Sequence, residues 1–331
     1  MLLIVFHHLS QQLTDPGSLK HLQNIGPLCV SFFFFESGYG LMRSVLTKEN
    51  YFHHFFRKRY IKLLLPFFVC NLIYLGVNMA FGTYYSPVRI IKCLIGLELV
   101  NTHAWFILTI MLFYLAFYLI FRFCKNRGLQ YVMLLFFQII YAAYCMHKGA
   151  GMQLFEGPWW FNSSSPFLIG VLLGGFEASV AAFLQKNYRL LMTLCVPAFL
   201  LFYVVSVYVT GTFPYQTQDM SPLSWRMLSS WFNLLWQSLA VIFFCLTVLL
   251  ASMKVKCSNP ILCFLGKISL ELYLIHGLFI QLFKGQLCTL QNDWLFIPAV
   301  LLGSVAAARL LYVPLHALIP KSRSAPEKLP I

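Results

Sequence analysis

The chain has 331 residues, of which 60% are hydrophobic and only 10% are charged, and its formal net charge is +14. A soluble globular protein carries about 25% charged residues, so this composition excludes a single water-soluble core. Apolar runs of about 20 residues alternate with short polar segments, which is the pattern of transmembrane helices. The basic residues fall between these runs and form no single patch or tail, so we expect the lipid bilayer as a partner and no nucleic acid.

The first segment, Met1 to Ser10, is apolar apart from the adjacent histidines His7 and His8. As a helix it would be about 15 Å long, half of the roughly 30 Å hydrocarbon core. We expect it to be the inner part of an N-terminally truncated first transmembrane helix, because the topology needs a complete first span. A re-entrant first helix is the alternative.

Nine further apolar runs follow, each long enough to cross a bilayer. The predicted spans are 28–46, 60–81, 104–123, 129–146, 166–183, 190–208, 228–253, 269–287 and 294–318. With the first segment they make about ten, so the predicted fold class is an all-α, polytopic membrane helix bundle. We expect one transmembrane domain over residues 1–320 and a short cytoplasmic tail at 321–331.

Most Lys and Arg residues occur in one alternating set of the segments that connect these spans. Positively charged connections face the cytoplasm, so this asymmetry predicts that both termini are cytoplasmic.

Polar and ionisable residues inside spans are costly and tend to mark function. Those that stand out are His7 and His8, Glu36 with Ser37 and Tyr39, the basic cluster Arg57, Lys58, Arg59 and Lys62, His103 with Trp105, and Glu271 with His276. Each also has a structural interpretation. The basic cluster can serve only as a topological anchor, the Trp can belong to an interfacial belt, and the histidine pair can hydrogen-bond a neighbouring helix. Glu271 and His276 can satisfy each other or a neighbouring helix in the bundle interior.

A metal site is disfavoured. Adjacent histidines face different sides of a helix, and neither a His-x-x-x-His motif nor a cysteine cluster accompanies them. The ten cysteines are scattered, mostly within apolar runs, and we expect them to be small core residues.

Five motifs occur in an order that resembles a known family. They are Phe33-Phe34-Phe35-x-Ser37-Gly38-Tyr39, Arg57-Lys58-Arg59-x-x-Lys62-x-x-x-Pro66, His103-x-Trp105-Phe106, the run Phe167–Gly174, and Phe264-Leu265-Gly266-Lys267-Ile268-Ser269-x-x-x-Tyr273-Leu274-x-His276. Over essentially the whole chain they resemble the acyltransferase 3 family, which are ten-helix bacterial membrane enzymes that O-acylate surface and secreted glycans.

The resemblance implies that a histidine of the first helix is catalytic, and His8 is the first choice for it, with His7 second. The family's partner arginine would lie before Met1. Its Arg-x-x-Arg motif becomes Arg59-Tyr60-Ile61-Lys62 here, and Lys62 cannot offer the bidentate contact that arginine gives a phosphate. Ser31 stands where many members carry an Asp.

The function implied is that of a membrane O-acyltransferase at the bacterial cytoplasmic (inner) membrane. It would transfer an acyl group, most commonly acetyl, from cytoplasmic acyl-CoA to a hydroxyl of a cell-surface or secreted glycan. Acyl-CoA is then a co-substrate, and no cofactor is bound. We expect Arg57, Lys58, Arg59 and Lys62 to bind the donor's phosphates. We expect the glycan acceptor to contact His103, Trp105, Ser37, Tyr39 and His276.

Glu36 is a further candidate for the catalytic group. Counted inward along its helix, it lies at a depth similar to that of a histidine about 16 Å into the first helix. We hypothesise that Glu36 orients His8, as a carboxylate does in a catalytic triad. A pairing of Glu36 with Arg309 or with a backbone group is the alternative.

Two other functions remain open. A transporter or flippase of lipid-linked glycans also places charges along a central path, but we find no inverted repeat, and the basic cluster lies at one face. A non-catalytic family member is the other alternative, because the partner arginine is missing.

Overall fold

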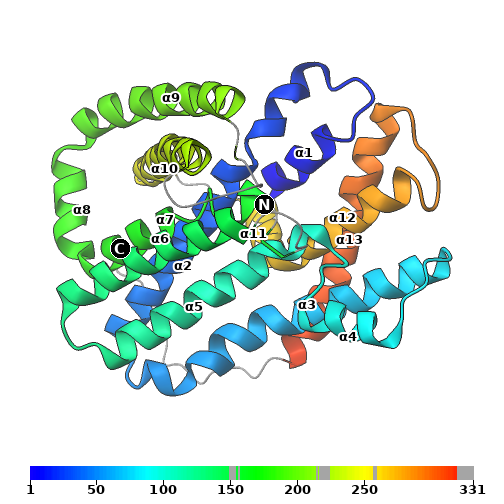
Figure 1. Ribbon diagram of the computed structural model, residues 1–331, viewed down its shortest axis with the longest axis horizontal. Helices are drawn as coiled ribbons and strands as arrows, with labels where there is room; N and C mark the ends of the chain where they lie inside the picture. Colours follow the sequence, from blue (N-terminus) through cyan, green and yellow to red (C-terminus); the bar gives the residue numbers. More distant parts are fainter. Residues whose placement is uncertain (149–153, 156, 214, 216–223, 256–258, 319–331) are drawn as a thin grey trace.

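The computed structural model describes residues 1–148, 154–155, 157–213, 215, 224–255 and 259–318 (Figure 1). The tail expected at 321–331 lies outside them. Within the described residues the regular structure is helical, and the one extended pairing is a bridge between Lys284 and Thr289. The helices are α1 (Leu2–Ser10), α2 (Gly26–Thr47), α3 (Phe55–Ala80), α4 (Pro87–Ile95), α5 (Trp105–Phe123), α6 (Arg127–Lys148), α7 (Pro166–Gly175), α8 (Glu177–Lys186), α9 (Tyr188–Thr212), α10 (Trp225–Ser252), α11 (Pro260–Lys267), α12 (Ser269–Phe283) and α13 (Asp293–Leu318). Four short 3-10 turns are η1 (Gly17–Asn24), η2 (Tyr51–His54), η3 (Thr102–Ala104) and η4 (Pro158–Trp160).

Among the described residues, six helices are long and apolar enough to cross a bilayer alone, and three bent pairs raise the number to as many as nine. The six contain α3, α5, α6, α9, α10 and α13, and the bent pairs are η1 with α2, α7 with α8, and α11 with α12. These spans correspond to the nine predicted after the first segment. The prediction of an all-α, polytopic membrane bundle is therefore confirmed.

Two predicted spans were wrong in shape. The run 166–183 is not one helix, because α7 and α8 meet at an angle of 97°. The break follows Gly174 and Gly175, and adjacent glycines are poor helix formers. The run 269–287 is also shorter than predicted: α12 ends at Phe283, and α11 precedes it at an angle of 78°.

The backbones of α2 and α7 touch, and this contact accounts for the glycines in both family-like motifs. A Cβ atom on Gly38 would lie 2.1 Å from the carbonyl oxygen of Phe167. One on Gly170 would lie 2.0 Å from the carbonyl oxygen of Phe35. Small residues let membrane helices approach this closely, so the two helices form a tightly packed pair in the bundle.

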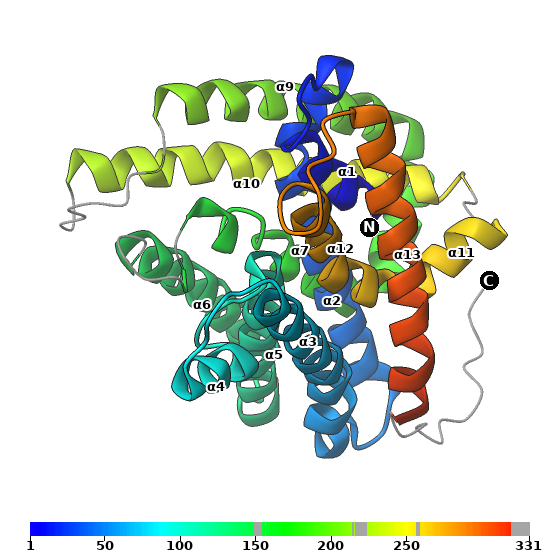
Figure 2. The same cartoon turned by 90° about the vertical axis from the view of Figure 1, so that its right-hand side faces the viewer.

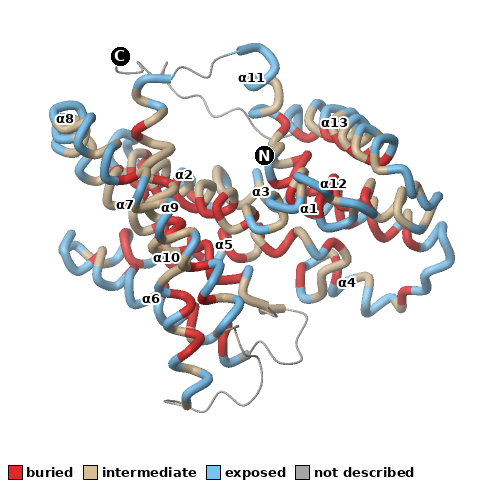
Figure 3. Tube along the Cα trace, turned by 90° about the horizontal axis from the view of Figure 1, so that it is seen from above, coloured by how far each residue is buried: buried red, intermediate tan, exposed pale blue. Residues whose placement is uncertain are grey.

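The outer helices are much less buried than the inner ones. Figure 3 shows buried residues along α5 and α12, whereas α8 and α11 contain no buried residue. In the most apolar window of each span, 61% of α5 is buried but only 11% of α9. α9 lies beside α10, and α13 beside α12 (Figures 1 and 2). In a bilayer the outward faces of these helices contact lipid.

The two ends of the bundle differ in their residues. At the end we call the histidine end, His7 of α1 packs against Gly26 at the start of α2, and His103 precedes α5. At the opposite end, called the basic end, η2 precedes α3 and α5 finishes near Arg122. There Phe52 of η2 packs edge-on against Tyr118 of α5, with 5.7 Å between ring centroids.

Candidate active site

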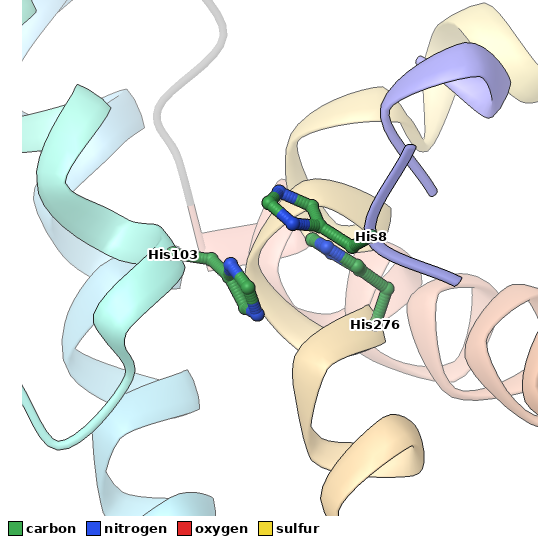
Figure 4. A group of neighbouring side chains, drawn as sticks. All are labelled: His8, His103 and His276. Atoms are coloured by element: carbon green, nitrogen blue, oxygen red, sulfur yellow. The ribbon is translucent and has the colours of Figure 1, made fainter. Parts of the chain in front are cut away.

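Three imidazole rings meet at the histidine end of the bundle (Figure 4). His8 comes from the last turn of α1, His103 from η3 and His276 from α12. The ring centroids are 4.0 Å apart for His8 and His103, 5.0 Å for His103 and His276, and 5.2 Å for His8 and His276. Folding therefore joins into one cluster, here called the histidine trio, three residues that the sequence only singled out separately.

The ring of His276 has a fixed tautomer. Its Nδ1 lies 2.8 Å from the carbonyl oxygen of Tyr273 and 3.2 Å from that of Leu272. A carbonyl oxygen only accepts, so Nδ1 carries the proton and Nε2 keeps a lone pair. That Nε2 is buried and has no hydrogen-bond partner among the described residues. His276 thus presents a free acceptor inside the protein.

A chain of hydrogen bonds sets the tautomer of His8. The Nδ1 of His7 donates to the carbonyl oxygen of Leu22 at 3.0 Å, so its Nε2 accepts from the Nε2 amide of Gln11 at 3.3 Å. The Oε1 of Gln11 can then only accept, and it lies 3.4 Å from the Nδ1 of His8. This leaves the lone pair of His8 on Nε2. Sequence reasoning missed Gln11, although its spacing of three and four residues from the histidines is that of neighbours on a helix.

His103 is held against α12 through its backbone. Its N–H donates to Oδ1 of Asn101 at 3.1 Å, and Nδ2 of Asn101 donates to the carbonyl oxygen of Leu274 at 2.8 Å. The hydroxyl of Tyr273 donates to the carbonyl oxygen of His103. A Cβ on Gly277 would lie 2.4 Å from the His103 ring, so a glycine is required where the ring crosses α12.

The histidine trio also has the composition of a metal site. One ring nitrogen from each residue lies within 4.8 Å of the other two. Zinc is bound at about 2.0–2.1 Å from histidine nitrogens, and three histidines are one of its ligand sets. The sequence-based expectation that no metal binds stays a prediction.

Glu36 lies away from the histidine trio. It interacts electrostatically with the amino group of Met1, which is seven residues, or about 10 Å, before His8 along α1. Since α1 ends against Gly26 at the start of α2, Glu36 lies ten residues, about 15 Å, further along α2. The expected pairing of Glu36 with His8 is not formed among the described contacts. Nor is the alternative with Arg309, whose guanidinium lies over the Tyr312 ring.

Ser37 and Tyr39 also lie along α2, beyond Glu36. The hydroxyl of Tyr114 donates to Oγ of Ser37 at 3.3 Å, and the hydroxyl of Tyr39 donates to Oε1 of Glu177 at 2.5 Å. Both residues therefore bind other helices, and neither contacts the histidine trio among the described contacts.

Trp105 and Glu271 are buried, but their described partners lie outside the histidine trio. Trp105 is 8% exposed and packs against Trp160, with 5.9 Å between ring centroids. Glu271 is 1% exposed, and its Oε1 lies 3.7 Å from Nε2 of His316. The alternative in which Glu271 and His276 satisfy each other is thus not observed.

The basic cluster divides into two parts. Arg59 is occupied inside the protein, because its Nε donates to the Tyr51 hydroxyl at 2.7 Å and its Nη2 donates to Oγ of Ser44 at 3.1 Å and to the Gly40 carbonyl at 3.3 Å. Of the other members, Arg57 and Lys62 are exposed, and Lys58 is partly exposed. Of the four residues expected to bind the donor's phosphates, Arg59 thus makes internal contacts, whereas Arg57 and Lys62 are exposed.

The two ends of the bundle are nearly one membrane thickness apart. His103 precedes the first residue of α5 and Arg122 lies in its last turn, 19 residues later. At 1.5 Å per residue this separation is about 28 Å. A substrate that contacts residues at both ends of the bundle must therefore extend over most of this distance.

The family model described as "Acyltransferase domain" (Acyl_transf_3) matches residues 1–313. The chain belongs to the acyltransferase 3 family. The match includes every member of the histidine trio, the basic cluster and all but the last residues of α13. No curated protein and no solved structure matches the chain. Membership in the acyltransferase 3 family and the apolar helices together identify a multi-pass membrane acyltransferase.

Proposed function

We propose that this acyltransferase 3 protein moves an acyl group, most commonly acetyl, from cytoplasmic acyl-CoA to a hydroxyl of a cell-surface or secreted glycan. It would act in the bacterial cytoplasmic membrane with both termini in the cytoplasm. The observation that carries the proposal is the lone pair on Nε2 of His8, which the hydrogen bonds through Gln11 leave beside two other histidines.

His8 acts as the general base, since neutral imidazole takes a proton near physiological pH. Its Nε2 accepts the proton of the acceptor hydroxyl while the oxygen attacks the carbonyl carbon of the thioester. As the tetrahedral intermediate collapses, the carbon–sulfur bond breaks. The leaving thiolate then takes the proton from His8 and departs as a thiol, so the base is regenerated and an ester is formed.

His276 and His103 help to bind the acceptor. The Nε2 of His276 is a buried acceptor without a partner, and a hydroxyl group would satisfy it. Because sugars carry several hydroxyls on neighbouring carbons, one can bind His276 while another meets His8. This arrangement supports a polyhydroxylated acceptor rather than water, and a glycan is such an acceptor.

The proposed donor must join an acyl group at the histidine trio to phosphates at the basic end. The histidine trio lies about 28 Å along α5 from the basic end, where the exposed Arg57 and Lys62 and the partly exposed Lys58 can attract an anion. Acyl-CoA has this form, since a flexible pantetheine chain joins its phosphates to the thioester. On this proposal the donor lies along the bundle, with its thioester toward His8 and its phosphates toward the basic end.

The test is the transfer of label from [14C]acetyl-CoA to base-labile macromolecular material in membrane vesicles from cells that produce the protein. His8→Gln should lower the rate about 10²–10⁴-fold, the usual range for loss of a general base. His7→Gln should lower it less, because both nitrogens of His7 are already hydrogen-bonded.

His21→Gln is the matched control, since His21 is exposed and lies near the histidine end. It should leave transfer unchanged, and wild-type transfer should survive EDTA if imidazole and not a metal is the base. If His8→Gln acylates as fast as the wild type, the assignment of the base fails. If glycan export stops while acylation continues, the transporter alternative replaces the enzyme.

A further inference from the structure

The basic end contains a cavity that the sequence did not indicate. Its volume is about 250 Å³, and it lies between the end of α2, η2 and the last turn of α5. Its lining includes Lys48, Asn50, Tyr51, Phe52, His53 and Arg122. We call it the η2 cavity.

The chemistry of the η2 cavity suits a phosphorylated ligand. Arg122 and Lys48 bring positive charge, and His53 and Asn50 bring N–H donors, whereas no carboxylate belongs to the lining. Phe52 adds an aromatic ring. Guanidinium and amide donors beside an aromatic ring are the groups that hold phosphates and a purine base.

Arg59 fixes one wall of the η2 cavity from behind. Its Nε donates to the hydroxyl of Tyr51, a residue that is 5% exposed and lines the cavity. The guanidinium is also anchored to Ser44 and Gly40 of α2. Arg59 therefore joins the start of α3 to the end of α2 and is a positioning residue for the cavity wall.

The size of the η2 cavity limits what it can hold. Small-molecule sites usually enclose about 300–1,000 Å³, so a cavity of about 250 Å³ takes one end of a large donor and not the whole. The rest of the donor must extend away from it. The acyl group would be delivered to the histidine trio, about 28 Å distant along α5.

We propose that the η2 cavity binds the adenosine phosphate end of acyl-CoA, with Arg122 as its principal phosphate ligand. This inference rests on the proposed function and assigns the nucleotide to residues outside the Arg57–Lys62 cluster. The phosphate of an anionic lipid headgroup shares part of this chemistry, so the test separates the two sources.

The probe is adenosine 3′,5′-bisphosphate, which lacks the pantetheine arm and the thioester. Its binding to the full chain in phosphatidylcholine nanodiscs is measured by calorimetry, alone and in competition with coenzyme A. Arg122→Gln should raise its Kd about tenfold, and Arg122→Lys should recover part of the loss, because a charge-assisted hydrogen bond is removed and then partly restored. The KM for acetyl-CoA should rise by a similar factor with little change in kcat.

Lys125→Gln is the matched control, since it removes the same charge three residues later and Lys125 does not line the cavity. The Kd of the Lys125→Gln variant for adenosine 3′,5′-bisphosphate should stay within about twofold of the wild-type value. Unchanged nucleotide binding in Arg122→Gln overturns the inference. The inference is also overturned if phosphatidylglycerol in the nanodisc displaces the probe and coenzyme A does not. That result would assign the cavity to a lipid headgroup. If wild type binds coenzyme A but transfers no acyl group, the proposed function fails while the cavity assignment stands.

Discussion

At the scale of single residues, His8 depends on Gln11 for the state of its ring. A free imidazole exchanges its proton between the two nitrogens, and only the tautomer with the lone pair on Nε2 presents a base to the other histidines. The Gln11 amide has a defined orientation because its nitrogen donates to His7, which is itself anchored to the Leu22 carbonyl. The bond to His8 is long, at 3.4 Å, and such bonds contribute about 0.5–1.5 kcal/mol at most.

Replacing Gln11 tests this dependence. Gln11→Leu should lower kcat about threefold to tenfold with the KM for acetyl-CoA unchanged, since the tautomer preference is lost but the donor site is intact. Imidazole 15N chemical shifts of His8 should move toward a mixed tautomer. Gln12→Leu is the control, because Gln12 is also exposed and has no described contact with either histidine. Unmoved His8 shifts in Gln11→Leu would show that the amide does not set the tautomer.

At the scale of helices, the contact between α2 and α7 depends on the absence of side chains at two positions. A Cβ on Gly38 would overlap the Phe167 carbonyl, and a backbone atom cannot turn aside as a flexible side chain can. By contrast, Gly40 lies on the same helix and has open space where a Cβ would go. The two glycines are thus a natural pair for separating packing from helix propensity.

Gly38→Ala should destabilise the bundle, whereas Gly40→Ala should not. Forcing two packed helices apart costs about 1–3 kcal/mol or more, and we expect a melting temperature in detergent lower by about 3 °C or more. Gly40→Ala should be neutral or slightly stabilising, since alanine is the better helix former. Equal melting temperatures for the two variants would contradict the close contact.

The helices themselves were largely predictable, because long apolar runs are a strong signal for membrane spans. Their breaks were not: hydropathy continues unchanged through Gly175 and Phe176, where the chain turns by 97°. The residues of the candidate active site were also recognised singly, as His8, His103 and His276. Their convergence depends on how α1, η3 and α12 pack, which hydropathy does not contain.

The estimate of depth along the helices failed for a related reason. It placed Glu36 level with His8 by assuming that both helices start at opposite surfaces of the membrane and that the histidine lies midway. In the structure α1 ends at Ser10, and its last turn meets the first turn of α2. A residue ten positions further along α2 is therefore out of reach.

At the scale of the whole molecule, the η2 cavity and the histidine trio are about 28 Å apart, so the proposed donor site and the proposed site of chemistry are separate. Binding energy gained at the basic end can then position a thioester at the histidine end. The tether between them has to cross most of the bundle. A donor without a nucleotide would lose the interaction with the basic end and keep only the interaction of its thioester with the histidine end.

S-acetyl-N-acetylcysteamine, a thioester with no nucleotide, should therefore be a poor donor. We expect its kcat/KM to be at least about a hundredfold below that of acetyl-CoA, because the remote binding energy is lost. Adenosine 3′,5′-bisphosphate should inhibit the reaction with acetyl-CoA and leave that with the short donor unaffected. Equal kcat/KM for the two donors, measured in the same vesicles, would refute a two-ended donor site.

The sparse burial of α9 has a consequence for how this chain can change over evolutionary time. Its best-anchored part is one end, where Thr210 donates to Oδ1 of Asn233 at 3.0 Å and accepts from Nε2 of Gln237 at 2.9 Å. Elsewhere on α9, solubility in lipid limits the choice of side chain more than fit does, because lipid tails adapt to any apolar shape. Such a surface can drift freely among Leu, Ile, Val and Phe, so two proteins of this kind can lose recognisable sequence identity there while their histidines stay aligned.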